Sequence, residues 1–235
     1  MATVIATPPL SVAEAFLSPA SLPGIPTGPV LIPRGEWIGD FLRNRRDWGG
    51  ARWDEVWNGV YIMSPFPNFV HQRLLTRLAA FFENVLASRQ VEVYAGLNVS
   101  DREEDWTKNF RIPDIAVLFP DNPARRLDAA LVGGPDFLVE ILSEDDKAAE
   151  KLEFYGRIGT RECLYLIPET RACQLYRLID QELRLVAQSS CEQPNICSSD
   201  VLGLTFQTVG SAADPKLRVA IPPDSTVQLA VSIEI

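Results

Sequence analysis

Two short apolar segments, each carrying one carboxylate, constrain the fold of this chain more than any other feature. Residues 114–119 (DIAVLF) and 136–142 (DFLVEIL) are runs of β-branched, aromatic and aliphatic side chains. Such runs predict buried strands. Side chains alternate between the two faces of a strand, so Asp114 and Glu140 each share a face with apolar neighbours. An ionised carboxylate in those surroundings needs a charged partner or a metal ion.

A lysine follows on the next predicted helix, which we place at residues 145–158 with Ser143 or Asp145 near its N-cap. At about 100° per residue, the apolar side chains of this segment form one stripe, and Lys151 falls inside it. A lysine on the core side of a helix needs a carboxylate nearby, and Glu140 is the obvious candidate. Lys147, one turn earlier, could replace Lys151 in this role.

Two acids and a lysine that converge at strand ends are the parts of a metal-dependent phosphodiesterase. The alternative is a structural ion pair between Glu140 and Lys151, with Asp114 capping a strand. Both remain open on these residues, because perturbed charges cluster at functional sites only statistically and buried pairs also occur for structural reasons.

The remaining segments predict an α/β domain with a mixed sheet. Residues 36–46 and 69–88 read as helices, and Asn58-Gly59 joins two strands in a hairpin. His71, near the start of the second helix, is interpreted as a hydrogen-bonded structural residue rather than a catalyst, although imidazole chemistry would suit acid–base work. Further strands are expected at the ranges 90–99, 162–167, 172–179 and 182–187, followed by weakly patterned chain at 188–235.

Composition narrows the class of protein. The 235 residues are 46 % hydrophobic and 23 % charged, which is typical of one globular domain. Residues 1–35 are rich in proline and predict an extended arm. No run of about 18 apolar residues and no signal-like segment is seen, so we expect a cytoplasmic protein with no membrane partner.

Charge and cysteine content bound the partners. The net charge of −9 argues against broad, non-specific nucleic-acid binding but allows a local basic groove. The arginines at 43, 45 and 46 and those at 125 and 126 are interpreted as solvated faces. The four cysteines have no CxxC spacing and predict reduced thiols rather than a zinc site or a disulfide framework.

The string RIPDIAV, followed by GGPDFLVEILSEDDKAAEKLEFY, resembles the family of "putative restriction endonucleases" in the PD-(D/E)XK nuclease superfamily. The upstream WDEVWNGVYIMSP resembles the hairpin of that family. The resemblance covers about residues 36–205, with the arm 1–35 before it and a tail at 206–235 after it. It implies a restriction-endonuclease-like mixed β-sheet flanked by helices.

The resemblance also implies roles for individual residues. Asp114 and Glu140 would bind Mg²⁺, or Mn²⁺ in its place, and the backbone carbonyl of Ile141 could add a ligand. Lys151 would orient the attacking water, and Glu55 would be a further acid of the site. The sequence departs from the usual superfamily pattern, in which the lysine stands two residues after the glutamate, because Leu142 occupies that position and the lysine has moved to the helix.

The expected function is therefore a metal-dependent endonuclease with nucleic acid, DNA foremost, as its partner, and with a homodimer left open. A catalytically inactive binding or assembly module with the same fold is the second hypothesis, and metal binding would separate the two. A sugar-cleaving enzyme with paired acids is a weaker third, because it leaves the inward lysine unexplained.

Overall fold

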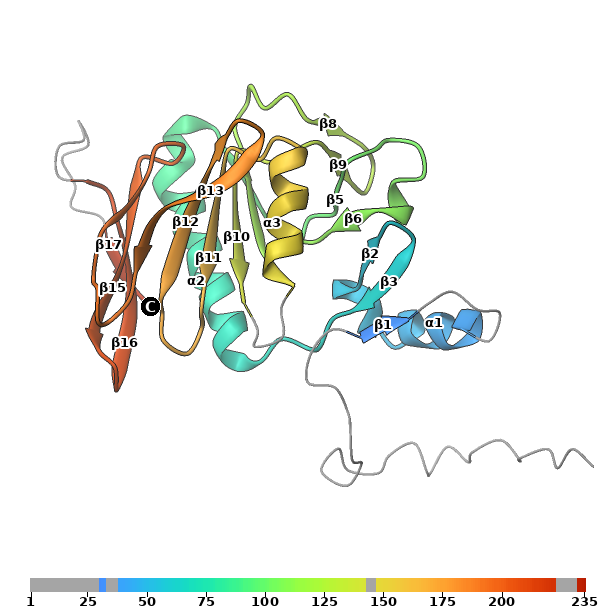
Figure 1. Cartoon of the computed structure of the whole chain (residues 1–235), viewed down its shortest axis with the longest axis horizontal. Coiled ribbons are helices and arrows are strands. Elements are labelled where there is room, and N and C mark those ends of the chain that lie inside the picture. The colour runs from blue at the N-terminus through green and yellow to red at the C-terminus, as the bar shows by residue number, and fades with distance from the viewer. Residues whose placement is uncertain (1–29, 33–37, 143–146, 223–231) are drawn as a thin grey trace, which may run out of the picture.

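A mixed six-stranded sheet forms the centre of the computed structural model, which describes residues 30–32, 38–142, 147–222 and 232–235 (Figure 1). In spatial order its strands are β13 (Glu182–Ser189), β12 (Cys173–Ile179), β11 (Glu162–Leu166), β10 (Phe137–Ile141), β7 (Ile115–Leu118) and β4 (Glu92–Ala95). Strands β10 and β11 run parallel, and the other neighbours run antiparallel. The predicted mixed sheet is thus confirmed.

Two helices cover opposite faces of this sheet, and the alternation of side chains along β10 shows which face is which. Phe137, Val139 and Ile141 belong to the core cluster that contains the apolar side of α2 (Phe69–Leu86). Leu138 belongs to the cluster beneath α3 (Ala148–Arg157). Glu140 therefore faces α3, as the period of two along a strand requires. The residues proposed above as the N-cap of α3, Ser143 and Asp145, lie outside the described residues.

Short strands beside the central sheet form a second sheet that carries the hairpin. The hairpin strands are β2 (Glu55–Trp57) and β3 (Val60–Met63), and they are joined by Asn58 and Gly59 with φ of 49° and 83°. Positive φ at both central residues is the geometry that Asn-Gly turns favour. The other strands of this sheet are β1 (Val30–Ile32), β6 (Phe110–Arg111), β5 (Val99–Ser100), β9 (Leu131–Val132) and β8 (Arg125–Arg126). Helix α1 (Ile38–Asp47) and the 3₁₀ turns Gly50–Trp53, Ala87–Arg89 and Trp106–Lys108 complete the helical elements of the described chain.

The single strand expected at residues 90–99 is wrong in one respect, because the chain changes sheet within it. β4 pairs with β7 in the central sheet, whereas β5 pairs with β6 and β9 in the second sheet. The change occurs at Gly96, which has φ of 73° and where a Cβ would overlap the ring of Trp53. Only glycine meets both conditions without strain.

The chain after residue 190 forms a third sheet from β14 (Cys197–Ser199), β15 (Leu204–Ser211), β16 (Asp214–Ala220) and β17 (Ser232–Glu234). Phe206, Leu217 and Val219 of this sheet are buried in the same core cluster as α2. Of the proline-rich arm, only Val30–Ile32 is among the described residues, where it pairs with β3.

Two further sequence expectations concern the chain as a whole. No described helix has the length and hydropathy that spanning a membrane would require. All four cysteines are free thiols, and three of them are buried in the core.

Candidate active site

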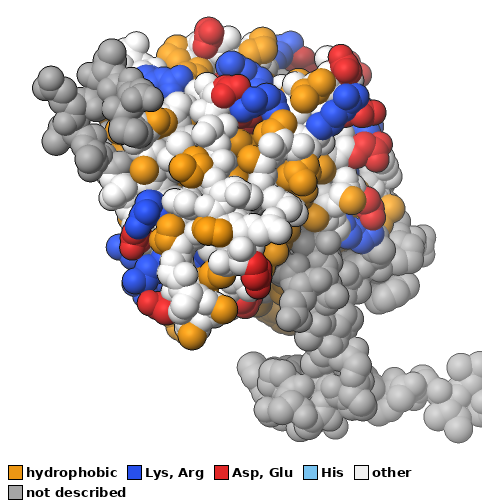
Figure 2. Space-filling model, turned by 60° about the vertical axis from the view of Figure 1, so that its left-hand side comes forward, with side chains coloured by type: hydrophobic (Ala, Val, Ile, Leu, Met, Phe, Trp, Pro, Cys, Tyr) orange, Lys and Arg blue, Asp and Glu red, His pale blue; other side chains and the backbone are white. Residues whose placement is uncertain are grey.

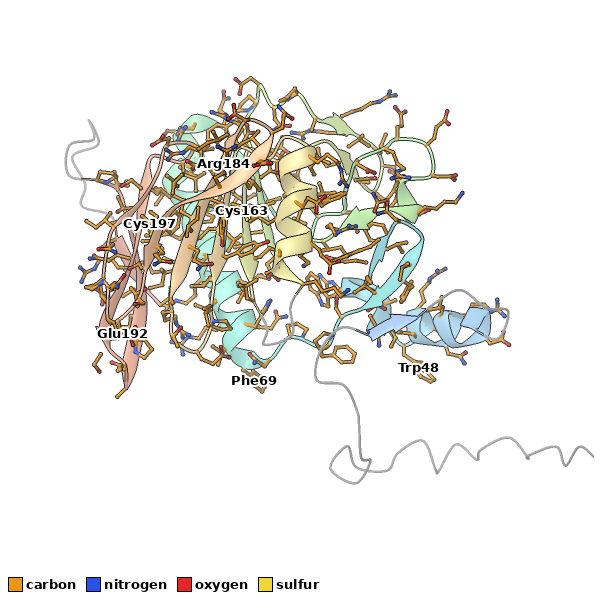
Figure 3. All side chains as sticks on the ribbon, in the orientation of Figure 1. Trp48, Phe69, Cys163, Arg184, Glu192 and Cys197 are labelled. Atoms are coloured by element: carbon orange, nitrogen blue, oxygen red, sulfur yellow. The ribbon has the colours of Figure 1, made fainter. Side chains whose placement is uncertain are left out.

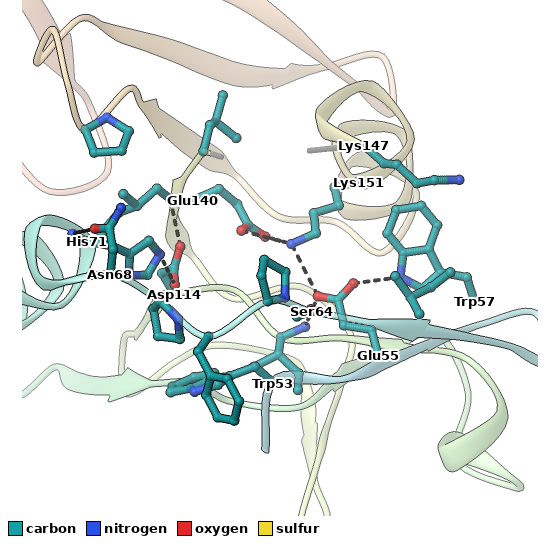
Figure 4. Close-up of a pocket in the computed structure, with 18 of the residues that line it drawn as sticks. Trp53, Glu55, Trp57, Ser64, Asn68, His71, Asp114, Glu140, Lys147 and Lys151 are labelled. Carbon is teal, nitrogen blue, oxygen red and sulfur yellow. Dashed lines mark hydrogen bonds and ion pairs between the residues drawn. The ribbon is translucent and has the colours of Figure 1, made fainter. Parts of the chain in front are cut away.

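The predicted site residues line one pocket of about 440 Å³, which lies between the central sheet and the sheet that carries the hairpin (Figure 4). Hairpin strand β2 supplies Glu55, Asp114 directly precedes β7, and the end of β10 supplies Glu140. The register of β7 against β10 pairs Ile115 with Val139, which brings Asp114 and Glu140 to adjacent positions. Lys151 enters from α3. The structure thus brings together the acids and the lysine predicted for the site, Glu55, Asp114, Glu140 and Lys151.

Glu140 is held by two donors from α3. Lys151 Nζ lies 3.2 Å and 3.1 Å from the two carboxylate oxygens of Glu140. The hydroxyl of Tyr155 donates a hydrogen bond of 2.6 Å to Glu140 Oε1. Glu140 is 2 % exposed and Lys151 is 9 % exposed. The inward direction of Lys151 and its pairing with Glu140, both expected from the helical wheel, are therefore present.

Lys151 also contacts a second buried acid. Its Nζ lies 3.3 Å from Oε1 of Glu55, which is 3 % exposed. Glu55 accepts hydrogen bonds of 2.6 Å from Trp57 Nε1 and 2.8 Å from the backbone N–H of Ile112. One ammonium group thus serves two carboxylates, and the hairpin is anchored to the central sheet through them.

Asp114 joins the ends of two elements. Its Oδ2 accepts a 2.7 Å hydrogen bond from the backbone N–H of Ile141, and its Oδ1 lies 3.1 Å from Nε2 of His71. The second nitrogen of His71, Nδ1, is buried and has no hydrogen-bond partner among the described residues. The sequence interpretation of His71 as a structural residue left it out of the site, whereas the structure places it in the pocket beside Asp114.

Lys147 differs from Lys151 in its surroundings. It lines the pocket, but its Nζ lies 3.5 Å from the exposed Glu150 and 5.5 Å from the ring centroid of Trp57. Its side chain is 27 % exposed, against 11 % for Lys151. Of the two lysines considered from the sequence, Lys151 is the one that contacts the acids of the site.

Buried groups around the pocket have shifted pKa values. Burial raises the pKa of Tyr155 well above its usual range, and the charge of Glu140 raises it further, so the hydroxyl remains a donor. Burial lowers the pKa of Arg111 to about 10, and the nearby charge of Glu55 opposes this. The Arg111 guanidinium lies over the rings of Trp57 and Phe154, at 4.1 Å and 4.3 Å from their centroids. The sequence analysis did not single out Arg111 or Tyr155 as site residues. Neither the guanidinium nor the hydroxyl gives a sequence signal of the buried position that it occupies.

The arginine clusters noted in the sequence are largely neutralised by acids. Arg45 binds Asp54 at 2.6 Å, Arg125 binds Glu103 at 2.5 Å and Arg126 binds Glu92 at 2.7 Å. Basic and acidic side chains also lie next to each other on the face drawn in Figure 2. These clusters therefore offer little free positive charge.

The pocket presents hard oxygen donors, which suit Mg²⁺ or Mn²⁺. Within the described part of the chain, no three His, Cys, Asp or Glu side chains stand close enough to hold a metal together. A cation here would use Asp114 and Glu140 with backbone oxygen, such as that of Ile141, and water, which is the ligand set that Mg²⁺ commonly accepts. Asp114 and two nearly buried glutamates in one pocket provide the negative charge that a divalent cation would balance.

A structural comparison agrees with this architecture. The chain is similar to the crystal structure of a "putative nuclease belonging to DUF820" from Anabaena variabilis, with a TM-score of 0.50 and 19 % sequence identity. The match covers 63 % of this chain and 82 % of that chain. At this identity the similarity shows the fold alone, and it bears out the expected restriction-endonuclease-like sheet. No curated protein matches the chain.

The sequence comparison extends over most of the described chain. The model of the Uma2 family, whose description is "putative restriction endonuclease", matches residues 42–210. That range contains every acid and lysine of the pocket and ends within β15. By this match over well over half of its length, the chain belongs to the Uma2 family.

Proposed function

We propose that this protein is a metal-dependent phosphodiesterase that cleaves nucleic acid internally, with DNA as the expected substrate. The observation that carries the proposal is the convergence of Asp114, Glu140 and Lys151 in one pocket of a nuclease-like fold. Membership of a family described as restriction endonucleases supports the same reaction class.

The proposed ligands of Mg²⁺ are Asp114, Glu140 and the carbonyl oxygen of Ile141. When bound, Mg²⁺ would supply Lewis-acid chemistry, neutralising charge on the phosphate and acidifying water. The hydrogen bond from the Ile141 N–H to Asp114 fixes one ligand relative to the strand that carries the other. The hydroxyl of Tyr155 fixes the second ligand, Glu140. The protein thus pre-positions its two carboxylates before any substrate arrives.

The lysine is proposed to act on the developing charge. In hydrolysis a water oxygen forms a bond to phosphorus, the bond to the leaving oxygen breaks, and negative charge builds on the phosphate. Lys151 Nζ, held between Glu55 and Glu140, would orient that water and stabilise the charge. Glu55 would keep the ammonium in place through its contact of 3.3 Å.

The alternative function is a catalytically inactive binding or assembly module. One observation favours it: the ammonium of Lys151 is already paired with two carboxylates, so the cluster could serve to join the hairpin, the sheet and α3. Such a module would retain the ion pairs without binding metal.

Metal binding and cleavage decide between the two functions. We expect wild-type protein to bind Mn²⁺ in calorimetry and to cleave DNA only when Mg²⁺ or Mn²⁺ is present. Asp114→Asn and Glu140→Gln keep the side-chain shape and remove the charge, so each should reduce metal affinity at least tenfold and cleavage by about 100-fold or more, comparable to the loss of other charge-stabilising groups.

Asp180→Asn is the matched control, because it makes the same chemical change at a 79 % exposed position in the turn between β12 and β13. It should leave both readouts unchanged. Absence of Mn²⁺ binding by folded wild-type protein, together with absence of metal-dependent cleavage, would establish the inactive module instead.

A further inference from the structure

One face of helix α2 carries exposed side chains that the core does not use. Phe69, Arg73 and Arg77 follow each other at intervals of four residues, which places them on the same side of a helix. All three are exposed, and Phe69 is 95 % exposed. The helix starts at the pocket, because its N-cap residue Asn68 and its third residue His71 both line that cavity. The exposed face therefore runs away from the active site.

Basic side chains outnumber acidic ones along α2. Arg73 and Arg77 are the basic residues of α2, and its one acid, Glu83, lies in the following turns. Neither arginine has an ion pair with any residue that the structure describes, unlike Arg125 and Arg126. In a chain with a net charge of −9, this is a local source of free positive charge.

A third arginine adds to the same region. Arg171 follows the pocket-lining residues Pro168 and Glu169 in the turn between β11 and β12. Its pKa is lowered mainly by burial, and the charge of Arg73 lowers it further while Glu169 opposes this. The positive charges of Arg73 and Arg171 thus repel each other, and the negative charge of a bound phosphate would offset this repulsion.

Exposed aromatic rings stand where this face meets the pocket. Phe66 lines the pocket and is 74 % exposed. It lies between Pro65 and Pro67, which restrict the backbone on both sides. Figure 3 shows Phe69, the first residue of α2, at the N-terminal end of the helix and pointing away from the sheet. Exposed phenyl rings beside a catalytic pocket provide flat apolar surfaces for planar ligands.

We propose that Phe66, Phe69, Arg73 and Arg77, named here the α2 stripe, bind single-stranded nucleic acid and lead it into the active site. Unpaired bases would stack on the two rings, and phosphates would contact the arginines. The eight helical steps from Phe69 to Arg77 correspond to a rise of about 12 Å along the helix axis, which is enough for the stripe to contact more than one nucleotide. Stacking needs an open base face, which duplex nucleic acid hides, so the stripe favours a single strand or a locally unpaired one.

This inference deepens the proposed function, because it names the form of substrate for the same pocket. We test it by measuring binding without metal, so that cleavage of the oligonucleotide does not affect the measured affinity. Fluorescence anisotropy with labelled oligothymidine in EDTA, repeated at several salt concentrations, gives Kd and its salt dependence. We expect wild type to bind the single strand at least tenfold more tightly than a duplex of the same length.

The variants separate the two halves of the stripe. Arg73→Gln with Arg77→Gln should weaken binding at least tenfold and lower the slope of log Kd against log salt by about 1.4, at about 0.7 per lost phosphate contact. Phe66→Leu with Phe69→Leu should weaken binding at least fivefold, because each phenyl ring would lose a stacked base, and should leave the salt slope unchanged. Arg125→Gln with Arg126→Gln is the control: it removes the same charge from arginines paired with acids, and it should change Kd less than twofold.

Several outcomes would overturn the stripe: no binding of the single strand, preference for the duplex, or equal loss in the control variant. The nuclease proposal fails on different evidence. Binding by the stripe without any metal-dependent cleavage would refute the nuclease and leave the stripe standing. Cleavage of single strands with unchanged kcat/KM in both stripe variants would refute the stripe and leave the nuclease standing.

Discussion

At the scale of single residues, the position of Lys151 between two buried acids determines what its replacement does. Its Nζ lies 3.3 Å from Glu55 and 3.1 Å from Glu140, and both carboxylates are almost fully buried. Removing one partner of a buried ion pair leaves an uncompensated charge, which costs about 3–5 kcal/mol. The ammonium therefore contributes to folding as well as to the proposed chemistry.

We expect Lys151→Met to abolish most metal-dependent cleavage and to lower the free energy of unfolding by about 3 kcal/mol. Lys147→Met should change the unfolding free energy by no more than about 0.5 kcal/mol, because Lys147 is partly exposed and its ion pair is with an exposed acid. Urea denaturation and single-turnover cleavage measure the two effects. Equal effects of both replacements would contradict the assignment of Lys151.

Adding Glu140→Gln to Lys151→Met provides the internal check. If the lost stability comes from the unpaired charge, the double variant should recover part of it, and the coupling energy should exceed about 1 kcal/mol. Additive effects would mean that the two side chains do not interact in solution.

The periodicity of the sequence was sufficient to predict Lys151 and Glu140 as neighbours, with Asp114 on the adjacent strand, because an inward charge on an apolar face needs a partner. Glu55 was expected at the site only from the family resemblance of the hairpin. The sequence could not identify His71 or Tyr155 as contacts of these residues. His71 lies near a helix start, where a structural role is common, and Tyr155 fits the apolar stripe without its hydroxyl. Which polar atoms meet depends on how α2 and α3 pack against the sheet, and helical periodicity does not contain that information.

At the scale of elements, the distance between α3 and the sheet is set at Gly134. A Cβ at this position would overlap the backbone of Gly159 and Thr160, which follow α3. The backbone N–H of Gly134 also donates a 2.7 Å hydrogen bond to the carbonyl of Ile158. The strand that carries Glu140 begins three residues later, so this close contact fixes the helix that carries Lys151 relative to that strand.

We expect Gly134→Ala to destabilise the protein by about 1–3 kcal/mol or more, because backbone atoms cannot move aside as a flexible side chain can. Cleavage should fall more than the loss of folded protein explains, since α3 would shift against β10. Gly39→Ala, on helix α1, meets only the end of the Arg43 side chain at 3.5 Å and should be neutral or stabilising. Equal urea midpoints for the two variants would show that the contact is not tight.

Elements with strong local signals were predictable, and those defined by distant contacts were not. The Asn58-Gly59 turn and helix α2 follow from turn chemistry and helical periodicity. The division of residues 90–99 into β4 and β5 does not, because the continuous apolar pattern fits one strand. The division depends on Trp53, which occupies the space beside Gly96 from about 40 residues away in the chain.

At the scale of the whole molecule, three aromatic rings join the C-terminal sheet to the central sheet. Phe206 of β15 stacks on Phe137 of β10, with centroids 5.9 Å apart and planes at 11°. The ring of Phe82 on α2 contacts both edge-on, at 6.3 Å from Phe206 and 6.1 Å from Phe137. The sequence after residue 188 does not predict this packing, because the rings that Phe206 contacts, Phe137 and Phe82, lie far from it in the chain.

The packing predicts that the C-terminal strands and the nuclease-like core unfold together. Phe206→Ala should lower the free energy of unfolding by about 3–5 kcal/mol, as expected for a buried phenyl ring. Phe69→Ala, at a 95 % exposed ring, should change it by no more than about 0.5 kcal/mol. Both variants should retain one cooperative transition, with fluorescence and circular dichroism coincident. A separate early transition in the Phe206 variant would show that the C-terminal sheet is an independent unit. Coincident transitions would instead mean that the candidate active site depends on strands distant from it in sequence, since Phe137 lies in the strand that carries Glu140.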